Sequence, residues 1–187
     1  MPSHVALLRG INVGGRNRVA MADLRQVVES LGHGEVATYI QSGNVVFTSN
    51  RSDTAAMAGE LGRALEETLG VRSSVVVLSR AELAKVIADN PFPDEANPRH
   101  LHAIFRGAEV DAREAAAVAA AERRARERGG RDQAKVVGRA VYLRTPDGLG
   151  RSELGAQLAR SNPDAKDRGG TARNWATVTR LLAMLDA

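Results

Sequence analysis

The chain has 187 residues, enough for one large domain or two small ones, and its content of 43% hydrophobic and 26% charged residues is that of a globular protein. It contains no cysteine, which excludes thiol catalysis, thiolate-bound zinc, iron–sulfur clusters and disulfides. The formal net charge of +4 favours an anionic partner. However, the basic residues are almost all arginine, which equally fits the codon bias of a GC-rich genome, so the position of each arginine matters more than the total.

No segment has the length or hydrophobicity of a membrane span, and the first apolar run, Val5–Leu8, is too short for the core of a signal peptide. We therefore expect a cytoplasmic protein with no membrane partner.

Apolar periodicity and turn residues predict the elements of the first half. The expected strands are 5–13, 36–41, 44–48 and 74–78, and the expected helices are 21–31, 53–69 and 79–88. Ser42-Gly43 is typical of a hairpin turn, and Ser79 with Glu82 forms a capping box at the start of the third helix.

Prolines between Asn90 and Pro98 predict a linker, after which a similar order begins again. The expected strands are 101–105, 134–137 and 140–144, and the expected helices are 111–128, 152–159 and 174–185. The domain boundaries predicted in this way are 1–89 and 100–187, with the linker at 90–99.

The fold class predicted by this order is α+β, with two ferredoxin-like subdomains of the βαββαβ type and largely antiparallel sheets. In the second half we expect the terminal helix to stand where the fourth strand would be. No residue-level repeat relates the two halves, so the duplication is one of architecture.

Near the N-terminus, Arg9-Gly10-Ile11-Asn12-Val13-Gly14-Gly15-Arg16-Asn17 follows a strand and precedes a helix. This arrangement is used to hold phosphate on backbone N–H groups, although the motif is neither a Walker loop nor G-x-G-x-x-G. The alternative is a tight turn at Gly14-Gly15, with Asn12 and Asn17 hydrogen-bonded to the local backbone.

Near the C-terminus, Thr171-Ala172-Arg173-Asn174-Trp175 places an arginine and an asparagine at the start of a predicted helix, and Arg151-Ser152 repeats this chemistry at another helix start. The alternative for the C-terminal motif is capping by Thr171 or Asn174, with Arg173 in solvent. A shared anion site is the hypothesis that links the motifs. Its ligand-binding residues would be Arg9, Asn12, Gly14, Gly15, Asn17, Arg151, Ser152, Arg173 and Asn174.

Five stretches together carry a resemblance to a known family: ALLRGINVGG from Ala6, TYIQSGNVVF from Thr38, NPFP from Asn90, PDGLGRS from Pro146 and TARNWATVTRLL from Thr171. In this combination and order, the chain resembles the bacterial family called "domain of unknown function 1697". The resemblance implies two ferredoxin-like subdomains in a stand-alone cytoplasmic protein with no established substrate. The chain departs from the family at Ala172, where a second threonine is usual, and at Glu153, where a lysine is frequent. An acidic residue at position 153 weakens any anion site there.

Other polar groups point less clearly to a site. Gln41-Ser42-Gly43-Asn44 is explained by turn chemistry, although it can also supply hydrogen-bonding groups to the rim of a site. His100 and His102 alternate on a strand but have no third ligand at suitable spacing, so no metal site is predicted. The arginines of helix 111–128 alternate with glutamates, as on a solvated face.

The resulting hypothesis is a binding module for a small phosphorylated or nucleotide-like anion, and the sequence leaves the identity of any cofactor open. One alternative is a phosphoryl- or nucleotidyl-transfer enzyme, for which Asp147 and Glu153 are the acids to test, so catalysis stays undecided and no catalytic residue is assigned. Another is a nucleic-acid or protein interaction module. Because only 3% of the residues are aromatic, nucleic acid would be bound through its phosphates and not by base stacking.

Overall fold

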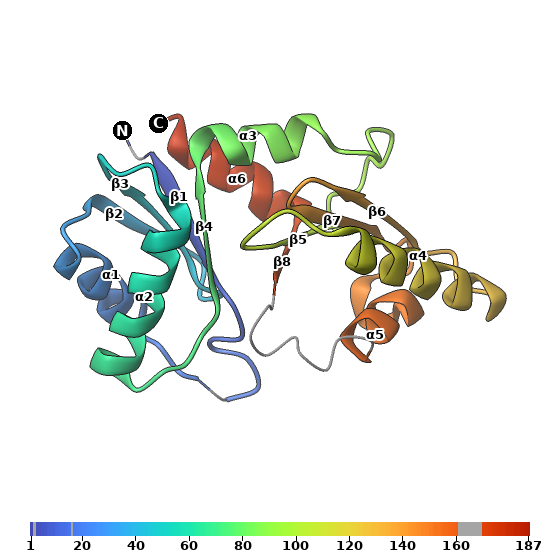
Figure 1. The fold of residues 1–187 in the computed structure, drawn as a ribbon, viewed down its shortest axis with the longest axis horizontal. Helices are drawn as coiled ribbons and strands as arrows, with labels where there is room; N and C mark the ends of the chain where they lie inside the picture. The colour runs from blue at the N-terminus through green and yellow to red at the C-terminus, as the bar shows by residue number, and fades with distance from the viewer. Residues whose placement is uncertain (2, 16, 161–169) are drawn as a thin grey trace. The chain divides into compact units, whose positions relative to one another are not determined.

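The structure is a computed structural model that describes residue 1 and residues 3–15, 17–160 and 170–187 (Figure 1). The chain divides into two units: Met1–Lys85 with Thr179–Ala187, and Val86–Val178. The predicted division at residues 90–99 differs from this one, since it assigned residues 179–187 to the second half. In the structure, the Arg80 guanidinium pairs with the Asp186 carboxylate at 2.5 Å, and both residues belong to the first unit.

The first unit contains one antiparallel sheet of strand order β2-β3-β1-β4. Its elements in chain order are β1 (His4–Leu8), α1 (Met21–Ser30), β2 (Gly34–Tyr39), β3 (Asn44–Thr48), α2 (Thr54–Leu69), β4 (Val75–Ser79) and α3 (Arg80–Ala88), which ends in the second unit. The predicted capping box is present at the start of α3, where the Ser79 N–H donates to Glu82 Oε2 and the Glu82 N–H donates to Ser79 Oγ.

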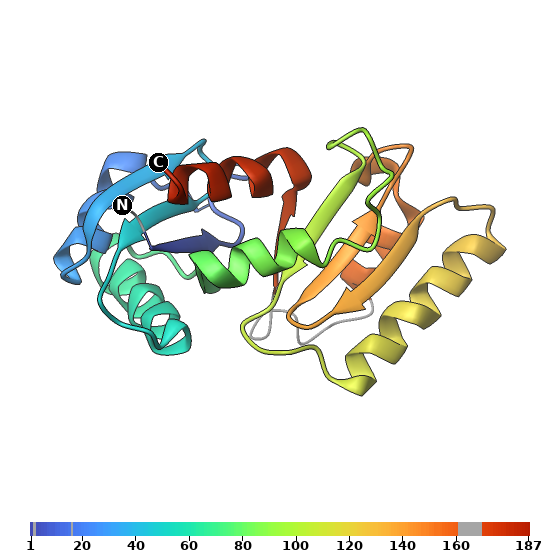
Figure 2. The same ribbon diagram turned by 90° about the horizontal axis from the view of Figure 1, so that it is seen from above.

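The second unit repeats this topology with strand order β6-β7-β5-β8. Its elements are β5 (Leu101–Phe105), α4 (Ala112–Glu127), β6 (Gln133–Val137), β7 (Ala140–Arg144), a 3₁₀ turn η1 (Leu149–Arg151), α5 (Glu153–Arg160), β8 (Thr171–Asn174) and α6 (Trp175–Leu185), which ends in the first unit. Figure 2 shows α1 and α2 beside the first sheet and α4 and α5 beside the second. The predicted α+β class with two ferredoxin-like subdomains and antiparallel sheets is therefore confirmed, and each of the two sheets described has four strands.

Two predicted elements differ from the structure. The terminal helix does not replace a fourth strand, because Thr171–Asn174 forms β8 beside β5 and the helix follows it. The sequence concealed this strand because an arginine occupies one of its buried positions. The first strand ends at Leu8 and not at Val13, since positive φ angles at Gly10 and Asn12 turn the backbone away from the extended conformation.

Both faces of the first sheet are buried. Residues such as Ala6, Val45 and Val77 pack with the apolar faces of α1 and α2 in one core cluster. The opposite face carries Val5, Leu7, Val46, Val76 and Leu78, each at most 3% exposed. Base stacking by RNA-recognition domains takes place on an open sheet face, and burial of this face is a second reason not to expect it here.

Among the described residues, no helix is both long enough and apolar enough to cross a membrane.

Candidate functional site

In the first unit, the connection from β1 to α1 (residues 9–20, here called the β1–α1 loop) is held in shape by hydrogen bonds from asparagine side chains to the backbone. Asn12 lies at φ 55°, in the left-handed region. Its Nδ2 donates to the carbonyl oxygens of Val19 and Gln41, each at 2.9 Å, and its Oδ1 accepts from the Val19 N–H at 2.9 Å. All of these bonds are made to backbone, so the Asn12 side chain holds the loop in shape and ties it to the turn between β2 and β3.

The tip of the loop is a tight turn. Gly14 and Gly15 have φ angles of 58° and 75°, as in the central pair of a type I′ turn, and both are exposed. The Asn12 N–H donates to the Asn17 carbonyl at 3.0 Å across the base of this turn, and Asn17 Nδ2 donates to the Gly10 carbonyl at 3.2 Å. Arg16 lies outside the described residues. The side chains of Asn12 and Asn17 are therefore hydrogen-bonded to the backbone, as expected from the alternative in which this motif is a tight turn.

The connection from β2 to β3 (residues 40–43, here called the β2–β3 turn) is joined to the same end of the sheet. The Leu8 N–H donates to the Gly43 carbonyl at 2.8 Å. Gly43 has φ 79°, and a Cβ at this position would lie 2.7 Å from Leu8 Cβ, so no side chain fits. Asn44 is fully buried, and its Nδ2 donates to the Tyr39 carbonyl and to Ser42 Oγ. The polar Gln41–Asn44 segment is thus a rigid support for the β1–α1 loop.

Charged and apolar side chains lie in solvent on these two connections. Arg9 is exposed, while its backbone N–H donates to the Ser74 carbonyl and to Ser73 Oγ and is thereby fixed. Arg18 is exposed as well. Val13 is 64% exposed and Ile40 is 52% exposed, and Ile40 has a φ of 49°. Neither apolar residue was predicted to be exposed, because no local pattern signals a positive φ at Ile40 or the exposure of Val13.

No described residue accepts a hydrogen bond from the N–H of Gly14 or Gly15. These donors lie on the loop and not at the helix N-terminus, because α1 begins six residues later, at Met21 after Ala20. The predicted order of strand, glycine-rich turn and helix is present, but the helix N-terminus is not adjacent to the glycines. What the loop offers an anion is exposed backbone N–H groups and arginine side chains.

In the second unit, two of the predicted residues have defined structural roles. Ser152 Oγ accepts from the Gly155 N–H at 2.8 Å, which caps α5, and donates to Asp132 Oδ2 at 2.7 Å. Both Ser152 and Asp132 are buried. Asn174 Oδ1 accepts from the Thr177 N–H at 2.9 Å and caps α6, as the capping alternative expected.

Arg173 is buried, at 8% exposed, so the expectation that capping would leave it in solvent is wrong. Its Nη1 donates to Thr171 Oγ1 at 2.6 Å and to the Ala172 carbonyl at 2.8 Å. Burial lowers the pKa of the guanidinium to about 10, which reflects the cost of a charge in surroundings of low polarity.

The pairing of β8 with β5 shows which face Arg173 occupies. Arg173 is opposite Ala103, which is opposite Tyr142 on the other side, so the three share one face. Val141 and Leu143 point to the other face, where they share a core cluster with Leu154 of α5. Arg173 and the start of α5 therefore lie on opposite faces of the second sheet, and Arg151, exposed on η1 beside Ser152, does not join Arg173.

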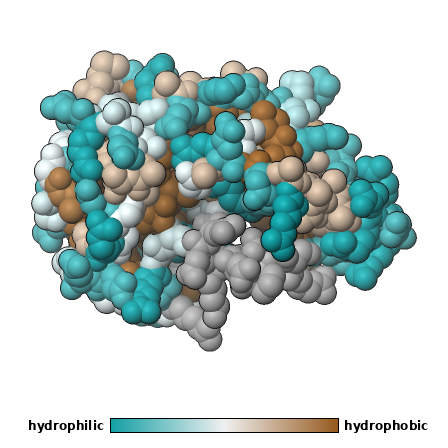
Figure 3. Space-filling model, in the orientation of Figure 1, coloured by the Kyte–Doolittle hydropathy of each residue, from teal (hydrophilic) through white to brown (hydrophobic). Residues whose placement is uncertain are grey.

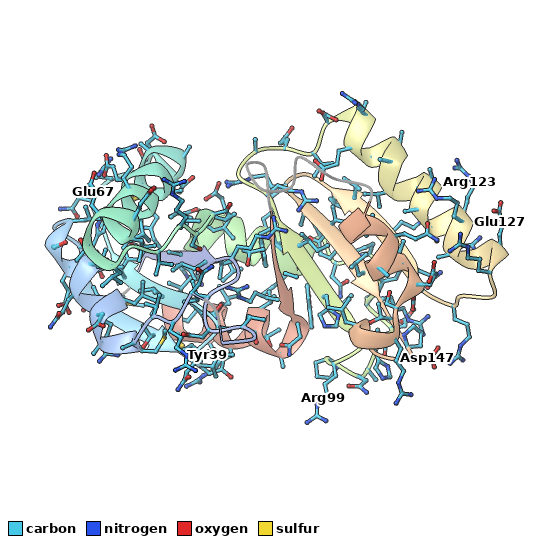
Figure 4. All side chains as sticks on the ribbon, turned by 90° about the horizontal axis from the view of Figure 1, so that it is seen from below. Tyr39, Glu67, Arg99, Arg123, Glu127 and Asp147 are labelled. Atoms are coloured by element: carbon cyan, nitrogen blue, oxygen red, sulfur yellow. The ribbon has the colours of Figure 1, made fainter. Side chains whose placement is uncertain are left out.

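The acids singled out for catalysis are engaged in ion pairs at the surface. Asp147 accepts from the Arg131 guanidinium at 2.5 Å, and Glu153 accepts from the Arg128 guanidinium at 2.7 Å. On α4, the labelled Arg123 and Glu127 point away from the sheet (Figure 4), in agreement with a solvated helix face.

His4, His33 and His102 are buried, whereas His100 is partly exposed. His102 is 9% exposed, and its Nδ1 has no hydrogen-bond partner among the described residues. Burial lowers the pKa of His102. His100 lies just before β5, where its Nδ1 is 3.3 Å from Glu95 Oε1. In the part of the chain that the structure describes, no three histidine or acidic side chains are grouped so that they could hold a metal ion.

Comparison with known proteins identifies relatives without an assigned activity. A family model described as "Protein of unknown function (DUF1697)" matches residues 1–142, which include the β1–α1 loop and the β2–β3 turn but end before Arg151 and β8. The fold is similar to that of the conserved bacterial protein SP0830 from Streptococcus pneumoniae, with a TM-score of 0.71, 23% sequence identity and 98% of each chain covered. No curated protein matches the chain.

Proposed function

The chain belongs to the DUF1697 family, and we propose that it binds a small phosphorylated anion at the β1–α1 loop of its first unit. The phosphate would accept hydrogen bonds from the exposed N–H groups of Gly14 and Gly15, and Arg9 and Arg18 would supply positive charge. Asn12 and Asn17 would act as positioning residues, since their side chains are hydrogen-bonded to the loop itself.

The observation that supports the proposal is the length and the unusual backbone conformation of this loop. In the second unit, the equivalent connection from β5 to α4 needs only residues 106–111, whereas the β1–α1 loop runs from residue 9 to residue 20. Besides three glycines, it holds two asparagines at positive φ, a conformation that residues other than glycine adopt infrequently and that asparagine tolerates better than most. A longer connection of unusual backbone conformation that leaves its tip exposed is expected where the loop itself has a role.

The surroundings of the loop agree with an anionic ligand. Arg9 and Arg18 are exposed on it, and no acidic residue occurs between Arg9 and Met21. Because the Asn12 and Asn17 side chains already hold the backbone on either side of Gly14 and Gly15, binding a phosphate there would require less ordering of the chain, which favours affinity. We place this binding in the cytoplasm.

The C-terminal residues of the predicted site are not members of the proposed binding site. Ser152 and Asn174 are used as helix caps, and Arg173 is buried. Of these residues, Arg151 alone is exposed, and we keep it as a separate cation and not as a member of the first-unit site.

The test is a thermal-unfolding series at fixed ionic strength with inorganic phosphate, pyrophosphate, sugar phosphates and nucleotides. A ligand at about 100 times its Kd stabilises the folded chain by about 2.7 kcal/mol, which for a chain of this size raises the midpoint by about 5–10 °C. We expect this shift in wild type and its loss in the double variant Arg9→Gln, Arg18→Gln.

The matched control is Arg123→Gln with Arg113→Gln, which removes the same charge from exposed positions of α4. If the control loses the shift equally, only the net charge matters and the proposed site is wrong. Turnover of a nucleotide in the presence of magnesium would favour the enzyme alternative. Binding of oligonucleotides with log K falling linearly with log salt would favour the nucleic-acid alternative.

A further inference from the structure

Ile40 combines two properties that the fold does not require. It is a β-branched residue at φ 49°, where such a side chain is a genuine outlier. Such a conformation lowers the stability of the fold. Its side chain is 52% exposed and therefore returns little of this cost through burial. Glycine or asparagine at this position would make the same turn with less strain.

A second exposed apolar residue lies on the neighbouring connection. Val13 follows Asn12, and the Asn12 side chain donates to the carbonyl of Gln41, the residue after Ile40. Large hydrophobic residues that are exposed are few in the described part of the chain: Met1, Val13, Ile40 and Leu149. Two of them, Val13 and Ile40, therefore lie on the β1–α1 loop and the β2–β3 turn, which the side-chain amide of Asn12 joins.

The same two connections carry the exposed arginines and the N–H groups of Gly14 and Gly15. A ligand that uses all of these groups has an anionic part for the arginines and N–H donors and an apolar part for Val13 and Ile40. A stable protein interface buries roughly 800 Å² on each partner, and two branched side chains offer far less. One flat ring is of the right size. On the visible face, Figure 3 shows hydrophilic residues interspersed with apolar areas.

We propose that the ligand of the β1–α1 loop is a nucleoside phosphate, whose base lies against Ile40 and Val13 while its phosphate is held by the loop. This inference rests on the proposed function and narrows its ligand class from phosphorylated anions to those with a planar base. Ile40 is here a specificity residue that distinguishes a nucleotide from a sugar phosphate, since it contacts only the base.

The experiment is isothermal titration with three probes that share a phosphate: AMP, ribose 5-phosphate and inorganic phosphate. GMP, CMP and UMP extend the set to other bases. In wild type we expect AMP to bind about tenfold or more tightly than ribose 5-phosphate. Tenfold corresponds to about 1.4 kcal/mol, which is about what burying two methylene groups provides.

The variant Ile40→Asn keeps a residue that tolerates the left-handed conformation and removes the apolar contact. We expect its Kd for ribose 5-phosphate to stay within about twofold of wild type, while the ratio between AMP and ribose 5-phosphate falls below about threefold. We also expect its unfolding midpoint in the absence of ligand to rise, because the backbone strain is relieved. Val13→Ser is the second variant, at a position where no strain changes.

The outcomes separate the two proposals. If ribose 5-phosphate binds and AMP binds no better, or if the ratio is unchanged in both variants, the nucleoside inference is wrong and the phosphate site stands. If none of the probes binds, both are wrong. A concentration-dependent dimer in sedimentation that disappears in Ile40→Asn would show instead that these side chains face a second copy of the chain, and would overturn the inference.

Discussion

The two units have the same strand order but close the corresponding end of the sheet in different ways. In the second unit, Gly138-Arg139 forms a two-residue turn, and the Arg139 guanidinium donates to the carbonyls of Arg106 and Gly107 at 3.2 and 3.1 Å. In the first unit, the connection between strands is longer, and Asn12 supplies the link from the opposite loop. Each unit thus uses one side chain to join two connections.

This comparison shows that the β1–α1 loop and the β2–β3 turn of the first unit have features that the same topology does not require in the second unit. The second unit makes the same topology with a short loop and no non-glycine residue at positive φ among those described. The first unit has four such residues: Asn12, Asn17, Glu35 and Ile40. Glu35 lies where the pairing of β2 with β3 shifts register, whereas the other three lie on the β1–α1 loop and the β2–β3 turn.

The largest effect is expected from a methyl group at Gly43. Its Cβ would lie 2.7 Å from Leu8 Cβ and 3.0 Å from Ile11 Cδ1, and its φ is 79°. We expect Gly43→Ala to lower the free energy of unfolding by about 2–4 kcal/mol, from overpacking and backbone strain together. Gly138→Ala, at φ 56° with nothing within 4 Å, is the matched change in the second unit and should cost about 1 kcal/mol. Urea unfolding followed by circular dichroism measures both, and equal costs would show that packing at Gly43 does not matter.

Removing the Asn12 side chain should cost about 2–3 kcal/mol, because the Val19 and Gln41 backbone groups lose their partners and alanine is strained at φ 55°. Asn12→Gly tolerates the φ angle and isolates the part due to hydrogen bonds. Arg139→Ala, the counterpart, should cost about 1 kcal/mol, since water replaces its bonds to accessible carbonyls. If Arg139→Ala proves the more costly of the two in urea unfolding, the first unit does not depend on its polar link.

The helices that follow β4 and β8 provide a smaller comparison. Ser79 and Glu82 cap α3 with two reciprocal bonds, whereas Asn174 caps α6 with one. Ser79→Ala and Asn174→Ala should each lower stability by about 1 kcal/mol, with Ser79→Ala the larger. The threonine variants Ser79→Thr and Asn174→Thr keep a capping oxygen and should restore part of the loss. A larger loss for Asn174→Ala would contradict this order.

The buried histidines are expected to lower the free energy of unfolding in acid but not at pH 7.5. In the first unit, the rings of His4 and His33 lie 5.6 and 4.6 Å from that of Phe47, and burial lowers the pKa of both, with the other charged groups nearby as smaller causes. In the second unit, burial lowers the pKa of His102. Because each folded pKa is below the ordinary value of 6.5, the unfolded chain binds protons first as the pH falls.

We therefore expect the free energy of unfolding to decrease as the pH falls below 6.5, until the folded histidines are protonated as well. Urea unfolding at pH 7.5 and 5.5 checks this. The double variant His4→Gln, His33→Gln should remove more of the difference than His102→Gln, since it removes two buried imidazoles. A wild type with equal stability at both pH values would contradict the prediction.

Much of the fold was predictable because its signals are local. The spacing of Leu61 and Leu65 predicts the buried face of α2, and both residues are buried. The capping box at Ser79 and the turn at Gly138 depend on residues within a few positions of one another, and both are present. Short-range periodicity and turn chemistry determine these elements wherever the segment lies in the fold.

Local sequence patterns were sufficient to predict the α+β class, most of the helices and strands, and the segments rich in polar residues. The roles of individual polar residues depend on contacts that form when the chain folds. Arg173 is buried because β8 pairs with β5, some 70 residues earlier in the chain. Asn12 holds a loop because Gln41 lies beside it, and the positive φ and exposure of Ile40 became visible only in the structure. Such roles depend on contacts between distant segments, which no local pattern of residues specifies.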